Sequence, residues 1–276
     1  MISFQRPFSA PTLLIAAALA AATPLGQVRA QQDVRAQEAA KAPVENLDCG
    51  VPSDLTRLAS PLTRTANRLA SGESLKVVAI GSSSTAGAGA SSPAHSYPSR
   101  LAIELAALFP KQQINVINHG ANGEETPDML ARFDRDVIAE KPDLVIWQVG
   151  TNAVLRDRPL MPAGTQMHEG LAKLKAIGAD VILVDLQFCP KVIVKAEADE
   201  MVNLISITAK KENVSVFRRF AVMKHWRQVA RIPYEKFLSP DELHLNDWSY
   251  GCIAKLLAGS IAEASTRATQ TAGAAH

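Results

Sequence analysis

Residues 76–90, KVVAIGSSSTAGAGA, change from an apolar run to small residues within a few positions. The apolar run predicts a buried strand, and the glycines and serines after it predict a tight loop at its carboxyl end. Such a loop can cradle a phosphate, serve as a flexible linker, present a serine nucleophile, or simply turn the chain. The remaining sequence decides among these alternatives.

Short apolar runs alternate with helical patterns on both sides of this stretch. The expected strands are residues 74–80, 114–118, 143–149, 180–186 and 214–217. Apolar residues at helical spacing predict helices between them, including one helix from Thr126 to Lys141 and a last helix with Asp247 as its N-cap. This order predicts an α/β fold, a five-stranded parallel sheet with helices on both faces. Its active site should lie at the carboxyl ends of the strands.

The two ends of the chain differ in composition from the part between them. Residues 1–30 have a charged start, an apolar stretch at 13–22 and small residues before Ala30, which is the layout of a secretory signal cut after Ala30. The apolar stretch is too short for a transmembrane anchor of about 20 residues. We therefore expect a signal peptide (1–30), a flexible lead-in (31–45), one domain (46–265) and a flexible tail (266–276), in a periplasmic or secreted protein.

The charge balance excludes some classes of partner. Removing residues 1–30 removes two arginines and no acid, which leaves 27 basic and 27 acidic side chains. A neutral domain has no bulk attraction for nucleic acid or for an anionic membrane surface. We therefore expect no nucleic-acid partner, and no membrane span once the signal is removed.

The three cysteines allow one disulfide bond, which an export compartment permits. We expect it between Cys49, in a lead segment that needs tying down, and Cys252, in the first turns of the last helix. Cys189 follows a buried strand and should stay reduced as a small apolar residue. Because the cysteine spacing fits no zinc site, no metal is expected.

Two ligand-binding interpretations of the first loop fail because residues they need are missing. A Walker-type phosphate loop needs a lysine after its last glycine, and the chain has none between Lys76 and Lys111. A dinucleotide fingerprint needs a third glycine and an acidic residue ending the second strand, where this chain has Ser92 and Asn118-His119. A linker does not fit between a buried strand and a helix. A serine nucleophile and an ordinary turn remain, and no cofactor is expected.

The other loops supply the groups that a serine nucleophile requires. Asp241 stands three residues before His244, so its carboxylate can orient one ring nitrogen and leave the other for a serine. Gly123, after the second strand, and Asn152, after the third, can donate hydrogen bonds to an oxyanion. Each group alone also suits a turn or a cap. Together, at one edge of the sheet, they favour ester hydrolysis.

In order and spacing these blocks resemble the SGNH hydrolases, or GDSL-type lipases and esterases, over about residues 75–262. The matching blocks are GSSST at 81–85, Asn118 with Gly123, GTN at 150–152, and Asp241 with His244. The resemblance implies a three-layer α/β/α sandwich of flavodoxin-like type. It implies Ser83 as nucleophile, His244 as base and Asp241 as the residue that orients it. It also implies an oxyanion hole made by the N–H groups of Ser83 and Gly123 and the amide of Asn152.

One residue departs from the family pattern. Ser82 stands where the family has aspartate, so the hydrogen bonds beside the nucleophile must be arranged differently. Some family members of carbohydrate-esterase type are similar in having GSS at this place. His119 and Arg156 border the expected site as candidate substrate contacts. Arg218 and Arg219 could either line the wall of a substrate pocket or have a structural role in packing and at the surface.

The resemblance implies a serine esterase that hydrolyses short-chain O-acyl esters through an acyl-enzyme on Ser83. The expected substrate is a small ester. The expected export and the family resemblance point to an acylated periplasmic glycan as one such ester. An O-acyltransferase using the same acyl-enzyme and a non-catalytic glycan-binding protein on this fold are the alternatives, and the intact Ser-His-Asp set disfavours the second. No residue identifies the acyl-chain length, the alcohol or the oligomeric state.

Overall fold

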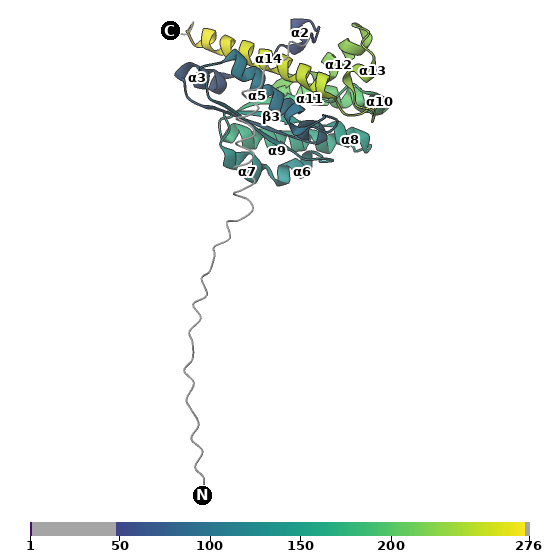
Figure 1. Cartoon of the computed structure of the whole chain (residues 1–276), viewed down its shortest axis with the longest axis horizontal. Helices are drawn as coiled ribbons and strands as arrows, with labels where there is room; N and C mark the ends of the chain where they lie inside the picture. Colours follow the sequence, from purple (N-terminus) through teal and green to yellow (C-terminus); the bar gives the residue numbers. More distant parts are fainter. Residues whose placement is uncertain (2–47, 274–276) are drawn as a thin grey trace.

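A five-stranded parallel sheet lies at the centre of the computed structural model, which describes Met1 and residues 48–273 (Figure 1). Its strand order is β2-β1-β3-β4-β5. The strands are β1 (Leu75–Gly81), β2 (Ile114–Gly120), β3 (Leu144–Gln148), β4 (Asp180–Val184) and β5 (Ser215–Phe217). The predicted α/β fold class is confirmed. Apart from Met1, the expected signal peptide (1–30) and lead-in (31–45) lie outside the described residues.

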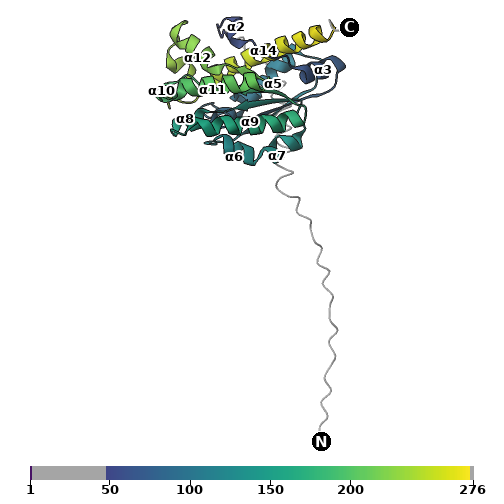
Figure 2. The same ribbon diagram turned by 180° about the vertical axis from the view of Figure 1, so that it is seen from behind.

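Helices cover both faces of the sheet, as Figures 1 and 2 show from opposite sides. The helices packed together on one face are α3 (Thr63–Ser71), α5 (Tyr97–Leu108) and α14 (Asp247–Gly273). Those packed together on the other are α6 (Thr126–Ala131), α9 (Leu160–Ala176) and α11 (Ala198–Lys211). In the part of the chain described, no helix is both long and apolar enough to cross a membrane.

Short helices lie in the connections. They are α2 (Ser53–Thr56), α4 (Ser83–Ala86), η1 (Pro93–His95), α7 (Phe133–Asp136), η2 (Ile138–Glu140), α8 (Thr151–Leu155), α10 (Pro190–Ile193), α12 (Arg219–Gln228) and α13 (Tyr234–Phe237). Several of them directly follow a strand, so they lie at the carboxyl edge of the sheet, where the site was expected.

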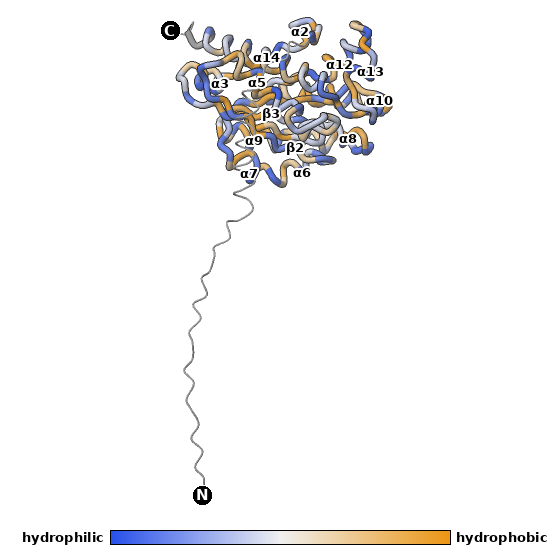
Figure 3. Tube along the Cα trace, viewed as in Figure 1, coloured by the Kyte–Doolittle hydropathy of each residue, from blue (hydrophilic) through white to orange (hydrophobic). Residues whose placement is uncertain are grey.

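The central strands form the core. Every residue of β3 is buried, and so is every residue of β4 after the first. Such strands need no apolar–polar alternation, because helices cover both their faces. The hydropathy tube is accordingly orange along much of the sheet (Figure 3). The edge strands are β2, which is mostly half-buried, and β5, which is only three residues long.

The strand order changes direction at β1. From β1 the chain crosses outward to β2, then returns past β1 to β3 and continues through β4 to β5. In folds of this type the ligand crevice lies outside the carboxyl ends of the strands at this point, here β1 and β3. The loops that follow these two strands carry Ser83 and Asn152.

The expected single helix from Thr126 to Lys141 is broken into α6, α7 and η2. The backbone leaves helical geometry at Arg132 (φ −115°, ψ 5°) and again at Val137 (φ −119°). The apolar spacing that predicted one helix is kept, since Phe133 and Val137 are fully buried. The break therefore redirects polar side chains, chiefly Arg132, without changing which face is buried.

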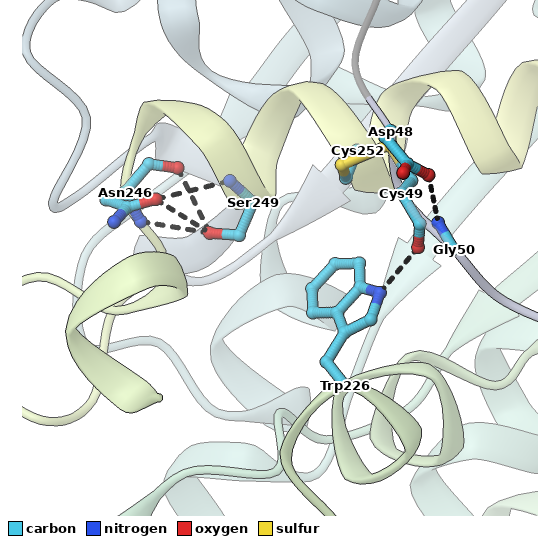
Figure 4. The surroundings of a disulfide bond; sticks show 7 residues. All are labelled: Asp48, Cys49, Gly50, Trp226, Asn246, Ser249 and Cys252. Carbon is cyan, nitrogen blue, oxygen red and sulfur yellow. Dashed lines mark hydrogen bonds between the residues drawn. A yellow bond between two sulfur atoms is a disulfide. The ribbon is translucent and has the colours of Figure 1, made fainter. Parts of the chain in front are cut away.

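The last helix differs from the prediction at both ends. Its N-cap is Asn246 and not Asp247: the Ser249 N–H donates to Asn246 Oδ1 at 3.2 Å and the Asn246 N–H to Ser249 Oγ at 3.1 Å (Figure 4). The tail expected from residue 266 is helical as far as Gly273. Alanine-rich sequence favours helix here, Ala268 is buried, and Arg267 donates to the Leu58 carbonyl at 2.5 Å.

Cys49 and Cys252 form the expected disulfide bond (Figure 4). Their Cα atoms are 5.4 Å apart, although 203 positions separate them in sequence. The same segment is held again by Trp226, whose indole N–H donates to the Cys49 carbonyl at 2.7 Å. Cys189 is a buried free thiol, and burial raises its pKa to about 12.

Removing the disulfide should destabilise the domain. The double variant Cys49→Ser/Cys252→Ser should lose about 2–4 kcal/mol in the free energy of unfolding, because the bond closes a long loop of the unfolded chain. Denaturant unfolding with and without reductant measures this. The wild type should lose stability on reduction and the double variant should not respond. An unchanged wild-type midpoint in reductant would contradict the expectation.

Candidate active site

Ser83 lies where β1 turns sharply into α4. Ser82 has extended backbone geometry (φ −91°, ψ −151°), and Ser83 is the first helical residue, whose N–H has no acceptor within the helix. Close approach of the chain requires glycine at two neighbouring positions. A Cβ at Gly81 would lie 2.2 Å from Thr85 Oγ1, and one at Gly120 would lie 2.1 Å from the Ala86 nitrogen. The end of β2 can therefore reach the helix that presents Ser83.

Ser83, His244 and Asp241 form a chain of hydrogen bonds. His244 Nε2 lies 2.8 Å from Ser83 Oγ, and His244 Nδ1 lies 2.5 Å from Asp241 Oδ2. Because the carboxylate accepts from Nδ1–H, the lone pair of Nε2 faces the serine hydroxyl and can take its proton. Ser83 is half-buried, the His244 side chain is 16% exposed and that of Asp241 is 43% exposed.

The Asp241 carboxylate holds its own loop as well as the imidazole. Oδ1 accepts hydrogen bonds from Ser239 Oγ (2.7 Å) and from the backbone N–H groups of Leu243 (3.0 Å) and His244 (2.9 Å). Partial burial works against ionisation, but these hydrogen bonds and that from the imidazole outweigh it and hold the pKa of Asp241 well below its ordinary range. The Asp241 carboxylate therefore stays ionised at neutral pH and can accept the hydrogen bond from the imidazole.

The expected oxyanion-hole residues lie on loops that touch each other. Asn152 is the second residue of α8, directly after β3, and its Nδ2 donates to the Glu124 carbonyl at 2.8 Å. An amide NH₂ has two hydrogens, so one remains for a ligand. Gly123 has φ +78°, a left-handed geometry that favours glycine. Arg156 Nη2 donates to its carbonyl at 2.8 Å, which helps to fix this loop.

Of the two candidate substrate contacts, Arg156 is held by local hydrogen bonds, whereas His119 is a half-buried side chain of the strand β2. Arg156 is held by the Gly123 carbonyl and by Glu125 Oε1, 2.7 Å from its Nη1. Burial lowers the pKa of His119, although the carboxylates of Asp136 and Glu140 act to raise it. Its Nε2 is buried without a hydrogen-bond partner among the described residues.

The family aspartate is replaced by a neutral arrangement. Both the N–H and the hydroxyl of Ser82 donate to Gln148 Oε1 at 2.8 Å, and both side chains are buried. Gln148 is the last residue of β3 and was not singled out in the sequence. Its place at the end of a buried strand was the available signal, since a polar side chain there faces the site loops.

Arg132 is a second residue that the sequence did not single out. It lies in the break between α6 and α7 and is largely buried. Its guanidinium donates to both carboxylate oxygens of Glu124, the closest contact being 2.6 Å, and to the His119 carbonyl at 2.8 Å. The carbonyl of the same Glu124 accepts from Asn152. Arg132 thereby fixes the loop after β2 beside Asn152.

A hollow of about 310 Å³ borders this loop. Its lining includes Glu125, Thr126, Ala153, Arg158, Pro159 and Gln166. Glu125 is paired with Arg156 and with Arg158, so its charge is compensated. Within the described part of the chain, no group of three or more histidine, cysteine, aspartate or glutamate residues is placed to hold a metal ion.

A Ser–His–Asp chain at the carboxyl edge of an α/β/α sandwich is the arrangement expected of SGNH-like hydrolases. A family model agrees, and the chain belongs to the non-GDSL lipase-like family, which it matches over residues 48–267. Ser82 in place of the GDSL aspartate fits that description.

Two curated relatives match shorter segments. An acetylxylan esterase of Geobacillus stearothermophilus is 37% identical over 79 residues, 29% of this chain and 36% of its own length. An arylesterase of Vibrio mimicus is 31% identical over 95 residues, 34% of this chain and 46% of its own length. The matched segments thus span less than half the length of either relative.

Solved structures share the fold. A two-domain esterase active on acetylated mannans has a TM-score of 0.66 and 21% identity, over 79% of this chain and 57% of that one. TesA has a TM-score of 0.58 and 18% identity, over 68% of this chain and 99% of that one. At such identities the similarity concerns the fold alone.

The role of Asp241 can be separated from its structural contacts. In Asp241→Asn the amide oxygen can keep the contacts of Oδ1, while the NH₂ group faces His244 Nδ1 and favours the wrong tautomer. If Asp241 orients His244, kcat should fall by about 10⁴-fold with the melting temperature near wild type. Glu242→Gln, an exposed neighbour, is the matched control and should keep its kcat. A near-wild-type kcat in Asp241→Asn would leave at most a Ser83–His244 pair.

Asn152 should act mainly on the transition state. Asn152→Ala should lower kcat on the order of 10²–10³-fold with little change in KM, because the lost donor serves an oxyanion that exists only during reaction. Steady-state kinetics on a synthetic ester checks this. Arg156→Met, which loosens the same loop without removing the donor, should cost much less. Equal losses in the two variants would mean that Asn152 only holds its loop.

Proposed function

We propose that this protein is a serine esterase that removes short O-acyl groups through an acyl-enzyme on Ser83. The observation that carries the proposal is the continuous hydrogen bonding from Ser83 Oγ through His244 to Asp241, at 2.8 Å and 2.5 Å. Family membership and the two esterase relatives support ester bonds as the target.

The proposed reaction has two halves. Ser83 Oγ attacks the acyl carbon while His244 Nε2 takes the hydroxyl proton, and the carbonyl oxygen becomes an oxyanion held by Ser83 N–H, Gly123 N–H and Asn152. The C–O bond to the alcohol then breaks, and His244 returns the proton to the departing oxygen. In the second half, water attacks the acyl carbon while His244 takes its proton. The bond from the acyl carbon to Ser83 Oγ then breaks, His244 returns the proton to Ser83 Oγ, and the carboxylic acid leaves.

We propose an acylated glycan as the natural substrate. The acetylxylan esterase relative and the structural neighbour active on acetylated mannans support an acetyl group on a polysaccharide. The signal-like composition of residues 1–30 supports export to the periplasm or beyond, where such polymers occur. Amino-terminal sequencing of the mature protein tests the export, and a chain that begins before Ala30 would count against it.

The same acyl-enzyme also supports a second candidate, an O-acyltransferase. In that reaction a glycan hydroxyl would replace water in the second half. Product analysis in the presence of an acceptor oligosaccharide separates the two, because a transferase yields a new ester where a hydrolase yields free acid. A non-catalytic binding protein is the outcome if Ser83 is unreactive.

Ser83 is tested directly by covalent labelling. A fluorophosphonate should label Ser83, and Ser83→Ala should abolish both labelling and ester hydrolysis, because neither neighbouring serine is bonded to His244. Peptide mapping identifies the labelled residue. A label on Ser82 or Ser84 would show that the nucleophile is misassigned.

The chain length and the alcohol are tested together. Rates on synthetic esters from acetyl to octanoyl should favour the shortest acyl chains, and acetylated xylan and mannan should then be compared. A preference for octanoyl would argue against a carbohydrate deacetylase.

A further inference from the structure

Arg219 is a buried cation directly beneath the candidate active site. It is the first residue of α12, immediately after β5, and it is only 1% exposed. Burial lowers the pKa of its guanidinium from the ordinary value. It lies on no loop that carries Ser83, Asn152 or His244, so nothing in the reaction proposed above uses it.

Every hydrogen bond given by this guanidinium goes to a neutral oxygen. Nε and Nη2 donate to the Asp185 carbonyl at 3.0 and 2.7 Å. Nη1 donates to Ser84 Oγ at 2.9 Å, and Nη2 also donates to Gln187 Oε1 at 2.9 Å. One side chain thus contacts the loop after β1 and two positions in the segment after β4.

These acceptors stand next to the site groups. Ser84 follows the candidate nucleophile Ser83. Gln187 Oε1 also accepts from Thr151 Oγ1 at 3.0 Å, beside Asn152. Gln187 Nε2 donates to the Leu243 carbonyl at 3.5 Å, beside His244. Arg219 thus contacts the loop of Ser83 directly, and it reaches the loops of Asn152 and His244 through Gln187. These three loops must be aligned with one another for acyl transfer.

Burial of this cation outweighs the attraction of the nearby Asp185 carboxylate, since the pKa of Arg219 stays below its ordinary value. Among the described residues, no ion pair includes Arg219, and the carboxylate of Asp185 accepts instead from the Phe220 N–H at 2.9 Å. Burial raises the pKa of Asp185 to about 7. A buried charge without a direct counter-ion costs free energy, which an apolar side chain of similar volume would not.

We propose that Arg219 is a positioning residue that holds the Ser83, Asn152 and His244 loops in register for the reaction. The proposal rests on the serine esterase function put forward above. Its planar guanidinium is suited to this, since several donors in a fixed fork can meet acceptors on different loops, which a lysine cannot do.

The test compares Arg219→Met and Arg219→Lys with wild type on a synthetic acetyl ester. Misalignment should lower kcat about 10–100-fold in Arg219→Met with KM within about threefold, and fluorophosphonate labelling of Ser83 should slow in parallel. Arg219→Lys should recover only part of the loss. A folded Arg219→Met protein with kcat within about twofold of wild type would overturn the proposal.

A matched control separates alignment from stability. Arg64→Met removes an arginine whose Nε donates to Asp143 Oδ1 at 2.9 Å, next to the amino end of β3 and so at the opposite edge of the sheet. It should lower the melting temperature and leave kcat unchanged. If Arg64→Met loses kcat as Arg219→Met does, the effect is general destabilisation and the proposal is wrong.

Two further measurements cover the remaining outcomes. If Arg219→Met does not fold, Ser84→Ala and Gln187→Met each remove one acceptor and should each lower kcat several-fold; unchanged kcat in both would overturn the proposal. If the wild type hydrolyses no ester, the esterase function fails, but crystal structures still test the positioning. The separation of Ser83 Oγ from His244 Nε2, 2.8 Å here, should then exceed hydrogen-bond distance in Arg219→Met, and an unchanged separation would refute the inference.

Discussion

The parallel pairing of β1 with β2 on one side and β3 on the other is the constraint on which the rest of the structure depends. Gly81 is in register with Gly120 and Ile80 with Trp147, so the three strands end at nearly the same level. Their loops therefore start side by side. The order also reverses here, so the crossovers from β1 and β3 run in opposite directions along the sheet. Groups far apart in the sequence, such as Ser83 and Asn152, need only short loops to reach one crevice.

The polar groups at the carboxyl edge of the sheet are arranged without an acid in the turn that carries the candidate nucleophile Ser83. Ser82 donates two hydrogen bonds to Gln148, and both side chains are neutral. The positive charge in this layer belongs to Arg219, which donates to Ser84. Asp241 is thus the carboxylate that directly contacts the imidazole, and its hydrogen bonds keep it ionised. Arg132 and Arg219, both largely buried, act on different loops. Arg132 fixes the segment after β2, and Arg219 the segments after β1 and β4.

The sheet and the site loops were predictable because their signals are physical and local. Unbroken apolar runs mark strands covered on both faces, and the polar residues just after them must lie at one edge. That rule found the loops of Ser83, Gly123 and Asn152. The same rule places Arg219, which follows the fifth strand, near this edge. An arginine is nevertheless expected at the surface. Its burial depends on hydrogen-bond acceptors from loops that are distant in the sequence. The cap at Asn246 results from side-chain hydrogen bonds to the backbone, and the break at Arg132 keeps the buried face unchanged, so apolar spacing shows neither.

The disulfide bond makes a covalent ring of the chain between Cys49 and Cys252, and this ring contains all five strands. A mechanical pull on the two ends is therefore carried by the sulfur–sulfur bond, and the hydrogen bonds of the sheet bear no load. A single protease cut within the ring opens it without releasing a fragment. The part of α14 beyond Cys252 lies outside the ring, so it can unravel under tension while the sheet and its crevice stay closed.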